Sequence, residues 1–283
     1  MSDSRIANRF DLLKKKGEPG LVTFLTAGDP DFETSLQILK KLPASGADVI
    51  ELGMPFSDPM ADGPAIQASS QRALKAGIDL KKIFSIVEIF RSEDTETPIV
   101  LMGYFNPIYI YGIEAFISDA ESAGVDGLII VDLPPEEPEL LHIMENSSLQ
   151  FIYLITPTTN DERLPKIIKH ASGFIYYVSV TGITGTKTAS SEHVELALSR
   201  IRRYTDLPIA VGFGIKTPEQ ATKMAKHADA AVVGSALVSR IEDNLDANGK
   251  PTSACVTAVL DFVGQISEGI RSISKNAQEN AAE

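Results

Sequence analysis

Apolar and polar residues follow one another along the chain in blocks of two kinds. Short, nearly continuous apolar runs predict strands that are buried on both faces. Longer stretches with apolar residues every three or four positions predict amphipathic helices. Eight runs of the first kind are expected to form strands, at Leu21–Ala27, Asp48–Leu52, Ile99–Met102, Gly127–Val131, Phe151–Ile155, Phe174–Val178, Ile209–Gly212 and Ala230–Val233.

Helical patterns lie between these runs. The first helix is expected ahead of all the strands, where apolar residues recur at helical spacing between Ser4 and Lys16. After the first strand, Asp29 is the expected N-cap of the next helix, with Pro30 at its first position. Further helices are expected at Leu80–Phe90, Ile113–Ala123, Pro138–Asn146, Leu164–His170, His193–Arg203 and Glu219–Lys226.

Strands that alternate with helices pair in parallel through helical crossovers, which indicates an α/β fold. The simplest closed form for eight such units is a (β/α)8 TIM barrel, which typically takes about 250 residues. The chain has 283 residues, so we expect this barrel with an extra N-terminal helix and a polar C-terminal tail at 272–283. An open doubly wound sheet is the alternative, because strand spacing alone fits both. No linker-like segment divides the chain, so residues 1–283 are expected to form a single domain.

Composition narrows the range of partners. The chain has 26 Lys and Arg against 38 Asp and Glu, and its net charge of −12 disfavours nucleic acid and anionic membranes as partners. Cys255 is the only cysteine, which excludes a disulfide framework and a cysteine-rich metal site. The four histidines show no metal-ligand spacing, and no cofactor motif is present, so neither a metal nor a cofactor is expected.

Two observations concern location. The N-terminus lacks the apolar core of a signal peptide. No stretch approaches the roughly 20 apolar residues that a helix needs to span a bilayer. A cytoplasmic location is therefore expected.

Candidate chemistry gathers at the second strand and the loop after it. Glu51 lies within the apolar run, and Asp62 follows in a loop whose density of Pro and Gly fixes the backbone. A buried acid is costly, which favours a role in acid–base chemistry. A purely structural interpretation is about as good for each residue alone. Glu51 could pair with a lysine, and Asp62 could form an Asx-turn before Gly63.

In a TIM barrel, chemistry sits at the carboxyl ends of the strands. This rule selects Phe24, Tyr104, Asp132 and Tyr176 beside the two acids. Each has a structural alternative, because the tyrosines could be core aromatics and Asp132 could cap the following helix.

Glycine-, serine- and threonine-rich segments follow the sixth, seventh and eighth expected strands, at 179–186, 212–215 and 234–236. Backbone N–H groups in such turns and at helix starts bind phosphate without side-chain charge. Barrels often hold a phosphate at the loops after strands seven and eight. A phosphate-bearing ligand is therefore expected, with tight turn geometry as the structural alternative.

Four motifs give the chain a specific resemblance. It is similar to the alpha subunits of tryptophan synthase in ELGMPFSDPMADGPAIQ, in LVTFLTAGDP upstream, and in YYVSVTGITG and VGFGI downstream. Order and spacing match from about Phe10 to Val263, and the acidic loop motif is the most specific part. The departures are conservative: Met54 and Met60 stand in place of branched aliphatics, and Phe105 stands where tyrosine is frequent.

The resemblance implies a lyase that cleaves indole-3-glycerol phosphate to indole and glyceraldehyde 3-phosphate by a retro-aldol reaction. It implies that Glu51 is the acid/base and that Asp62 hydrogen-bonds the indole N–H. Tyr176 would lie near the glutamate, Phe24 and Tyr104 would hold the indole, and Thr184 would close against the Asp62 loop. The phosphate would be held by Gly185, Phe213, Gly214, Gly234 and Ser235.

The resemblance also implies a partner, the pyridoxal-phosphate beta subunit, in an α2β2 heterotetramer. The docking face would surround Asp58, Asn106–Pro107 and Pro134–Pro135. Two other functions are weighed against this one. An isomerase or epimerase acting on a sugar phosphate is disfavoured by the acidic loop and the scattered histidines. A subunit that only activates its partner is disfavoured because both acids are present.

Overall fold

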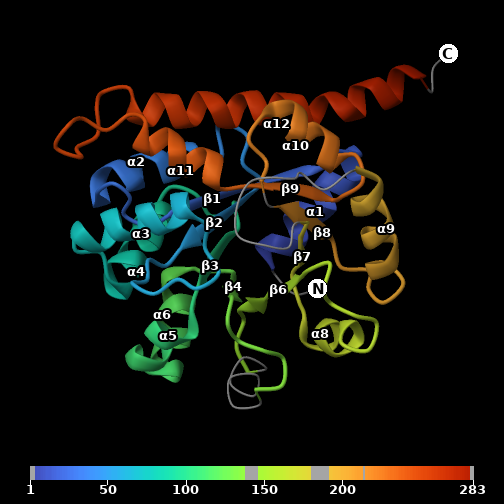
Figure 1. Cartoon of the computed structure of the whole chain (residues 1–283), viewed down its shortest axis with the longest axis horizontal. Helices are drawn as coiled ribbons and strands as arrows, with labels where there is room; N and C mark the ends of the chain where they lie inside the picture. The colour runs from blue at the N-terminus through green and yellow to red at the C-terminus, as the bar shows by residue number, and fades with distance from the viewer. Residues whose placement is uncertain (1–3, 138–145, 180–190, 213, 281–283) are drawn as a thin grey trace.

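The described strands run parallel to their neighbours and form one barrel-shaped sheet (Figure 1). The computed structural model describes residues 4–137, 146–179, 191–212 and 214–280, with the backbone alone at 191 and 274–280. The order of strands is β5-β4-β3-β2-β1-β9-β8-β7-β6. Their bounds are β1 Gly20–Thr26, β2 Val49–Gly53, β3 Ile99–Gly103, β4 Gly127–Ile130, β5 Gln150–Phe151, β6 Tyr153–Ile155, β7 Ile175–Val178, β8 Ile209–Gly212 and β9 Ala230–Val233.

The two ends of this order are joined by the chain itself. The run expected as one strand at Phe151–Ile155 is divided into β5, which pairs with β4, and β6, which pairs with β7. Between them, the backbone N–H of Ile152 donates to the carbonyl oxygen of Leu128 at 2.9 Å. The expected (β/α)8 barrel is thereby confirmed, and the open doubly wound sheet is wrong.

Helices alternate with the strands around the barrel (Figure 1). The expected helix at Pro138–Asn146 lies almost entirely outside the described residues. The last helix continues to Asn280, so the expected polar tail is helical up to that residue. None of the described helices is both long and apolar enough to cross a membrane. Their bounds are α1 Arg5–Lys16, α2 Phe32–Lys41, α3 Pro64–Lys75, α4 Leu80–Arg91, α5 Phe105–Tyr111, α6 Ile113–Ala123, α8 Leu164–His170, α9 Ser191–Ile201, α10 Pro218–Ala225, α11 Ser235–Glu242 and α12 Cys255–Asn280.

The extra N-terminal helix, α1, closes the amino end of the barrel. Ser4 caps it by accepting a hydrogen bond from the N–H of Ala7, and Gly17 ends it in the left-handed conformation at φ 65°. Its apolar face packs against side chains from the starts of the strands, so one end of the barrel is filled with apolar groups. This inner cluster contains Ile6, Phe10, Leu13, Val22, Val49, Val100, Ile129, Ile152, Phe174, Ala210, Ala230 and Val232.

Polar contacts tie α1 to the strand starts. Arg5 donates to Asp126 at 2.9 Å, and Arg9 lies 3.7 Å from Asp48. Each aspartate also accepts a backbone N–H from the preceding strand of the barrel, from Ile99 for Asp126 and from Leu21 for Asp48. With the amino end closed in this way, the carboxyl ends of the strands are left to form a site.

Candidate functional site

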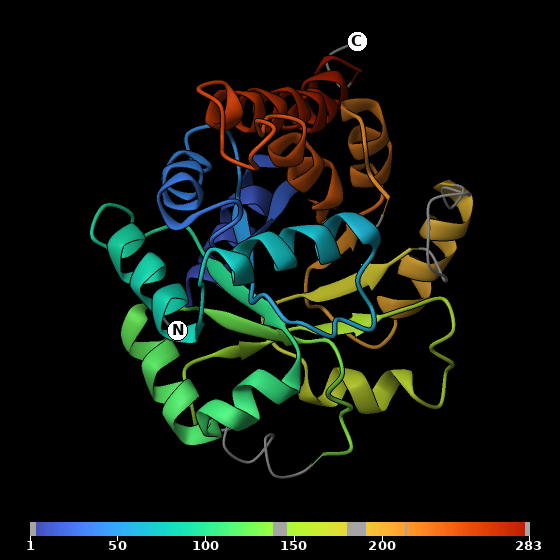
Figure 2. The same ribbon diagram turned by 60° about the vertical axis from the view of Figure 1, so that its left-hand side comes forward.

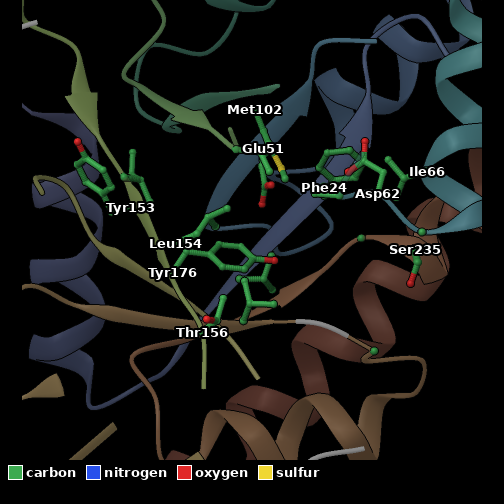
Figure 3. A pocket seen from close by; sticks show the side chains of 18 of the residues that line it. Phe24, Glu51, Asp62, Ile66, Met102, Tyr153, Leu154, Thr156, Tyr176 and Ser235 are labelled. Atoms are coloured by element: carbon green, nitrogen blue, oxygen red, sulfur yellow. The ribbon is translucent and has the colours of Figure 1, made fainter. Parts of the chain in front are cut away.

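A cavity of about 1130 Å³ opens at the carboxyl ends of the strands. Glu51 and Asp62 both line it, together with Phe24 and Tyr176 (Figure 3). The glycine turns expected to hold a phosphate reach the same cavity, through Gly214, Gly234 and Ser235. The structure therefore brings the two acids and the glycine-rich loops to one end of the barrel.

Strand alternation places Glu51 inside the barrel. Ile50 and Leu52 pack outward beneath the helices, whereas Val49 and Glu51 point inward. Only 2% of the glutamate is exposed, and its Oε2 atom has no hydrogen-bond partner. Burial, and to a lesser extent the charge of Asp62, raises the pKa of Glu51 to about 8. At neutral pH the group is therefore mostly protonated and can donate a proton.

Asp62 lies half-buried in the loop between β2 and α3. Burial raises its pKa to about 6, against a hydrogen bond from the Tyr104 hydroxyl that lowers it. At neutral pH the aspartate is therefore mostly ionised. One cavity thus holds a protonated carboxyl group, Glu51, and an ionised one, Asp62. Different surroundings therefore give the two residues different roles, Glu51 as a proton donor and Asp62 as an anion.

Two aromatic rings form walls beside the acids (Figure 3). Phe24 is packed so closely that a Cβ at Gly53 would lie 2.6 Å from its Cζ atom. Similarly, a Cβ at Gly212 would lie 2.5 Å from the Tyr176 hydroxyl oxygen. Burial, and to a lesser extent the charge of Glu51, raises the pKa of Tyr176 well above its usual value, so its hydroxyl stays protonated. The glycines on β2 and β8 thus make room for the rings.

Tyr104 contacts the acidic loop rather than the wall of the large cavity. Its hydroxyl oxygen accepts the backbone N–H of Ala61 at 3.0 Å, and its ring centroid lies 5.4 Å from that of Phe56. It lines a small adjoining pocket that it shares with Phe24 and Asp62. Tyr104 therefore fixes the loop that carries Asp62.

The expected phosphate-binding residues are described only in part. Gly214 has a φ of 78°, a backbone conformation that favours glycine, and Gly234 precedes the helix that begins at Ser235. Three expected residues, Thr184, Gly185 and Phe213, lie outside the described residues.

Asp132 lines the large cavity and has a definite partner. Its Oδ1 atom accepts the backbone N–H of Phe105 at 2.8 Å, which ties the loop after β4 to the start of α5. The sequence interpretation of Asp132 as a helix cap did not include this contact with a neighbouring loop.

Several residues that line the cavity were not predicted from the sequence, among them Met102 and Leu154 inside the barrel. Both stand on strands in the inward phase, so the alternation that places Glu51 could have found them. Arg240 was missed as well and lines the cavity together with Lys216, which was considered for the phosphate, and both add positive charge. In the part of the chain that the structure describes, no three His, Cys, Asp or Glu side chains group as metal ligands would.

Comparison with known families gives a match along nearly the whole chain. A family model described as tryptophan synthase alpha chain matches residues 10–269. This range includes both acids and the described glycine turns.

Solved structures give the same result. Tryptophan synthase subunit alpha from Legionella pneumophila strain Paris is 40% identical, with a TM-score of 0.87, over 95% of this chain and 99% of that one. A protein from Aquifex aeolicus VF5 is 37% identical, with a TM-score of 0.84 and coverages of 95% and 99%. Tryptophan synthase from M. tuberculosis, in an open form with BRD0059 bound, is 31% identical, with a TM-score of 0.83 and coverages of 95% and 99%.

Proposed function

The chain belongs to the tryptophan synthase alpha chain family, and we propose that Glu51 and Asp62 carry out the family's reaction in the cavity described above. That reaction is the retro-aldol cleavage of indole-3-glycerol phosphate to indole and D-glyceraldehyde 3-phosphate, a carbon–carbon lyase step in the biosynthesis of L-tryptophan. The observation that supports the assignment is the buried carboxyl group of Glu51, whose Oε2 atom has no hydrogen-bond partner, in the same cavity as Asp62.

The first step is protonation of the indole ring. Glu51 delivers its proton to indole C3, which becomes tetrahedral and leaves positive charge on the ring nitrogen. This step needs Glu51 to be protonated at neutral pH, and the raised pKa of Glu51 supports its role as the proton donor. Asp62, mostly ionised, accepts the indole N–H and stabilises the positive charge that develops there.

The second step breaks the carbon–carbon bond. The Glu51 carboxylate takes the proton of the 3′-hydroxyl group, and the hydroxyl oxygen becomes the carbonyl oxygen of glyceraldehyde 3-phosphate. The electron pair of the broken bond returns to the ring and neutralises it as indole. Glu51 ends protonated, so the cycle closes without another reagent.

The remaining site residues bind the substrate. We assign Phe24 to the indole side and Tyr176 to the neighbourhood of Glu51, as their shared cavity supports. Tyr104 is assigned to the indole side from the resemblance, supported by the small pocket that it shares with Phe24 and Asp62. The phosphate is assigned to main-chain N–H groups at Gly214, Gly234 and Ser235. The resemblance adds Gly185 and Phe213 to the phosphate and Thr184 to the loop that closes against Asp62.

A partner is proposed as well, a pyridoxal-phosphate beta subunit in an α2β2 assembly. Large apolar side chains are exposed where the docking face is expected: Met60 is 74% exposed, Tyr109 66% and Ile110 75%. They lie on the segments that contain Asp58 and Asn106–Pro107. Large apolar side chains that gather on an exposed surface mark protein interfaces, and these three stand on two of the segments expected to dock. We propose a cytoplasmic location with it, because the sole cysteine, Cys255, is free and buried.

One assay tests the function and the partner together. Indole release from indole-3-glycerol phosphate is measured with the chain alone and with a beta subunit added. We expect release in both cases and faster release in the complex, because docking would hold the Asp62 loop closed. A chain that binds substrate and releases no indole with or without the partner would contradict the proposal.

A further inference from the structure

Two buried polar contacts hold α3 against the end of β1. The hydroxyl oxygens of Thr26 and Ser69 lie 2.6 Å apart, and both residues are buried. The carboxylate of Asp29 accepts from Arg72 twice, from Nε at 2.7 Å and from Nη2 at 2.9 Å. Ser69 and Arg72 are three residues apart in α3, so both side chains lie on one face of the helix. We call the two contacts together the clamp, because they fix both the rotation and the axial position of α3.

The hydrogen bonds have a definite direction at Ser69. Its hydroxyl group donates to the carbonyl oxygen of Ile66 at 2.8 Å, so its oxygen accepts from Thr26. Ile66 lines the large cavity one turn before Ser69. The contact is therefore continuous from β1 through α3 to the cavity wall.

The Asp29–Arg72 pair is costly to bury. The Asp29 side chain is fully enclosed, and burial raises the pKa of its carboxyl group although Arg72 opposes this. Buried ion pairs add little net stability over apolar packing, but a bidentate guanidinium–carboxylate pair fixes geometry. The sequence expectation that Asp29 caps α2 was wrong: Asp31 is the cap, through a hydrogen bond from the N–H of Thr34. Asp29 is thereby left for Arg72.

The beginning of α3 needs such support. The helix starts at Pro64, two residues after Asp62, and its N-cap, Gly63, offers no side-chain hydrogen bond. At the other end, Arg72 Nη1 also lies 3.8 Å from Glu242, the last residue of α11. Helices α3 and α11 lie side by side (Figures 1 and 2). The guanidinium therefore joins α3, which follows the Asp62 loop, to the loop after β1 and to α11, which begins at Ser235.

We propose that Arg72 and Ser69 are positioning residues, which hold α3 in the register that places Asp62 against the substrate ring. The inference rests on the proposed role of Asp62. Without the clamp, α3 shifts along β1, and the carboxylate moves away from the indole nitrogen. Misplacement of a catalytic group by about 1 Å costs about 100-fold in rate.

The test compares Arg72→Met and Ser69→Ala with a matched pair elsewhere. Arg91 donates to Asp126 at 2.6 Å at the amino end of the barrel, so Arg91→Met breaks a similar buried pair away from the site. We expect both clamp variants to lower kcat by about tenfold or more with KM within about threefold, and Arg72→Lys to recover part of the loss. Arg91→Met is expected to unfold at lower temperature and to keep kcat within about twofold.

Ser69→Ala removes a single hydroxyl, so the comparison stands if Arg72→Met fails to fold. Clamp variants that fold and keep kcat within about twofold would overturn the inference.

A second background separates this inference from the proposed function. In Asp62→Asn, the Arg72→Met change is expected to add less than about a twofold loss, because the group that it positions is already gone. If Arg72→Met lowers kcat in the Asp62→Asn enzyme by the same factor as in the wild type, Arg72 does not act through Asp62. An Asp62→Asn enzyme with unchanged kcat would instead contradict the proposed role of Asp62.

Discussion

Glu51 and Asp62 lie in one cavity in opposite protonation states at neutral pH. Burial is the larger cause of both raised pKa values, but Asp62 also receives a hydrogen bond from Tyr104, whereas Glu51 Oε2 has no partner. The two pKa values lie about two pH units apart, more than glutamate and aspartate differ in water, and the excess comes from what surrounds each group. It divides the chemistry into a proton donor and an anion before any substrate arrives.

Glu51→Gln tests the donor. Glutamine fills the same space and cannot deliver a proton, so we expect kcat to fall by about 100-fold or more. Binding of a phosphate-bearing product analogue, measured by calorimetry, is expected to be unchanged, because Glu51 stands on β2 whereas the glycine turns follow β8 and β9. Turnover near the wild-type rate would remove Glu51 from the mechanism.

The pH profile of kcat/KM tests both groups. Asp62 must be ionised, so activity rises as pH passes about 6, and Glu51 must be protonated, so activity falls as pH passes about 8. The substrate phosphate also titrates near pH 6. Asp62→Asn is therefore the control, because it removes the contribution of the aspartate to the acid limb and leaves that of the phosphate. A profile flat from pH 7 to 10 would contradict the assignment of Glu51.

The buried carboxyl group of Glu51 is expected to lower the stability of the folded protein. The pKa of Glu51 is about 8 in the folded chain, against 4.5 for a glutamate exposed to water, so the folded state binds the proton more tightly. Stability is then lost as pH rises from about 4.5 to 8, on the order of 3 kcal/mol by pH 7. We expect Glu51→Gln to exceed the wild type in free energy of unfolding by about that amount at pH 7, and much less at pH 4. Urea denaturation at both values measures the difference, and an equal gain at both would contradict a buried titrating group.

Much of this arrangement could be predicted from periodicity. The two-residue alternation on β2 and β7 that turns Glu51 and Tyr176 inward is a local property of the sequence. Partner choice was harder to predict. Asp29 was expected to cap α2, but Asp31 does so, and Asp29 instead pairs with Arg72, which lies 43 residues away from it in the chain.

The interruption of the fifth strand was likewise not visible in the sequence. The apolar run is continuous through Ile152, and the change of pairing from β4 to β7 depends on closure of the whole barrel. Local pattern therefore predicts which side chains face inward, while long-range contacts decide caps, ion pairs and strand breaks.

Gly212→Ala tests how tightly the aromatic wall is built. A methyl group there would lie 2.5 Å from the Tyr176 hydroxyl oxygen and 2.9 Å from Val232 Cβ, so the ring must move. Because Tyr176 lies in the cavity with Glu51, we expect kcat/KM to fall by about tenfold or more. The matched control is Gly264→Ala in α12, where an added Cβ meets nothing within 4 Å. This control is expected to keep its activity and to gain about 0.5–1 kcal/mol in stability, because alanine is the better helix former. Equal activity in the two variants would show that Tyr176 has room to move and that its packed position is not needed for turnover.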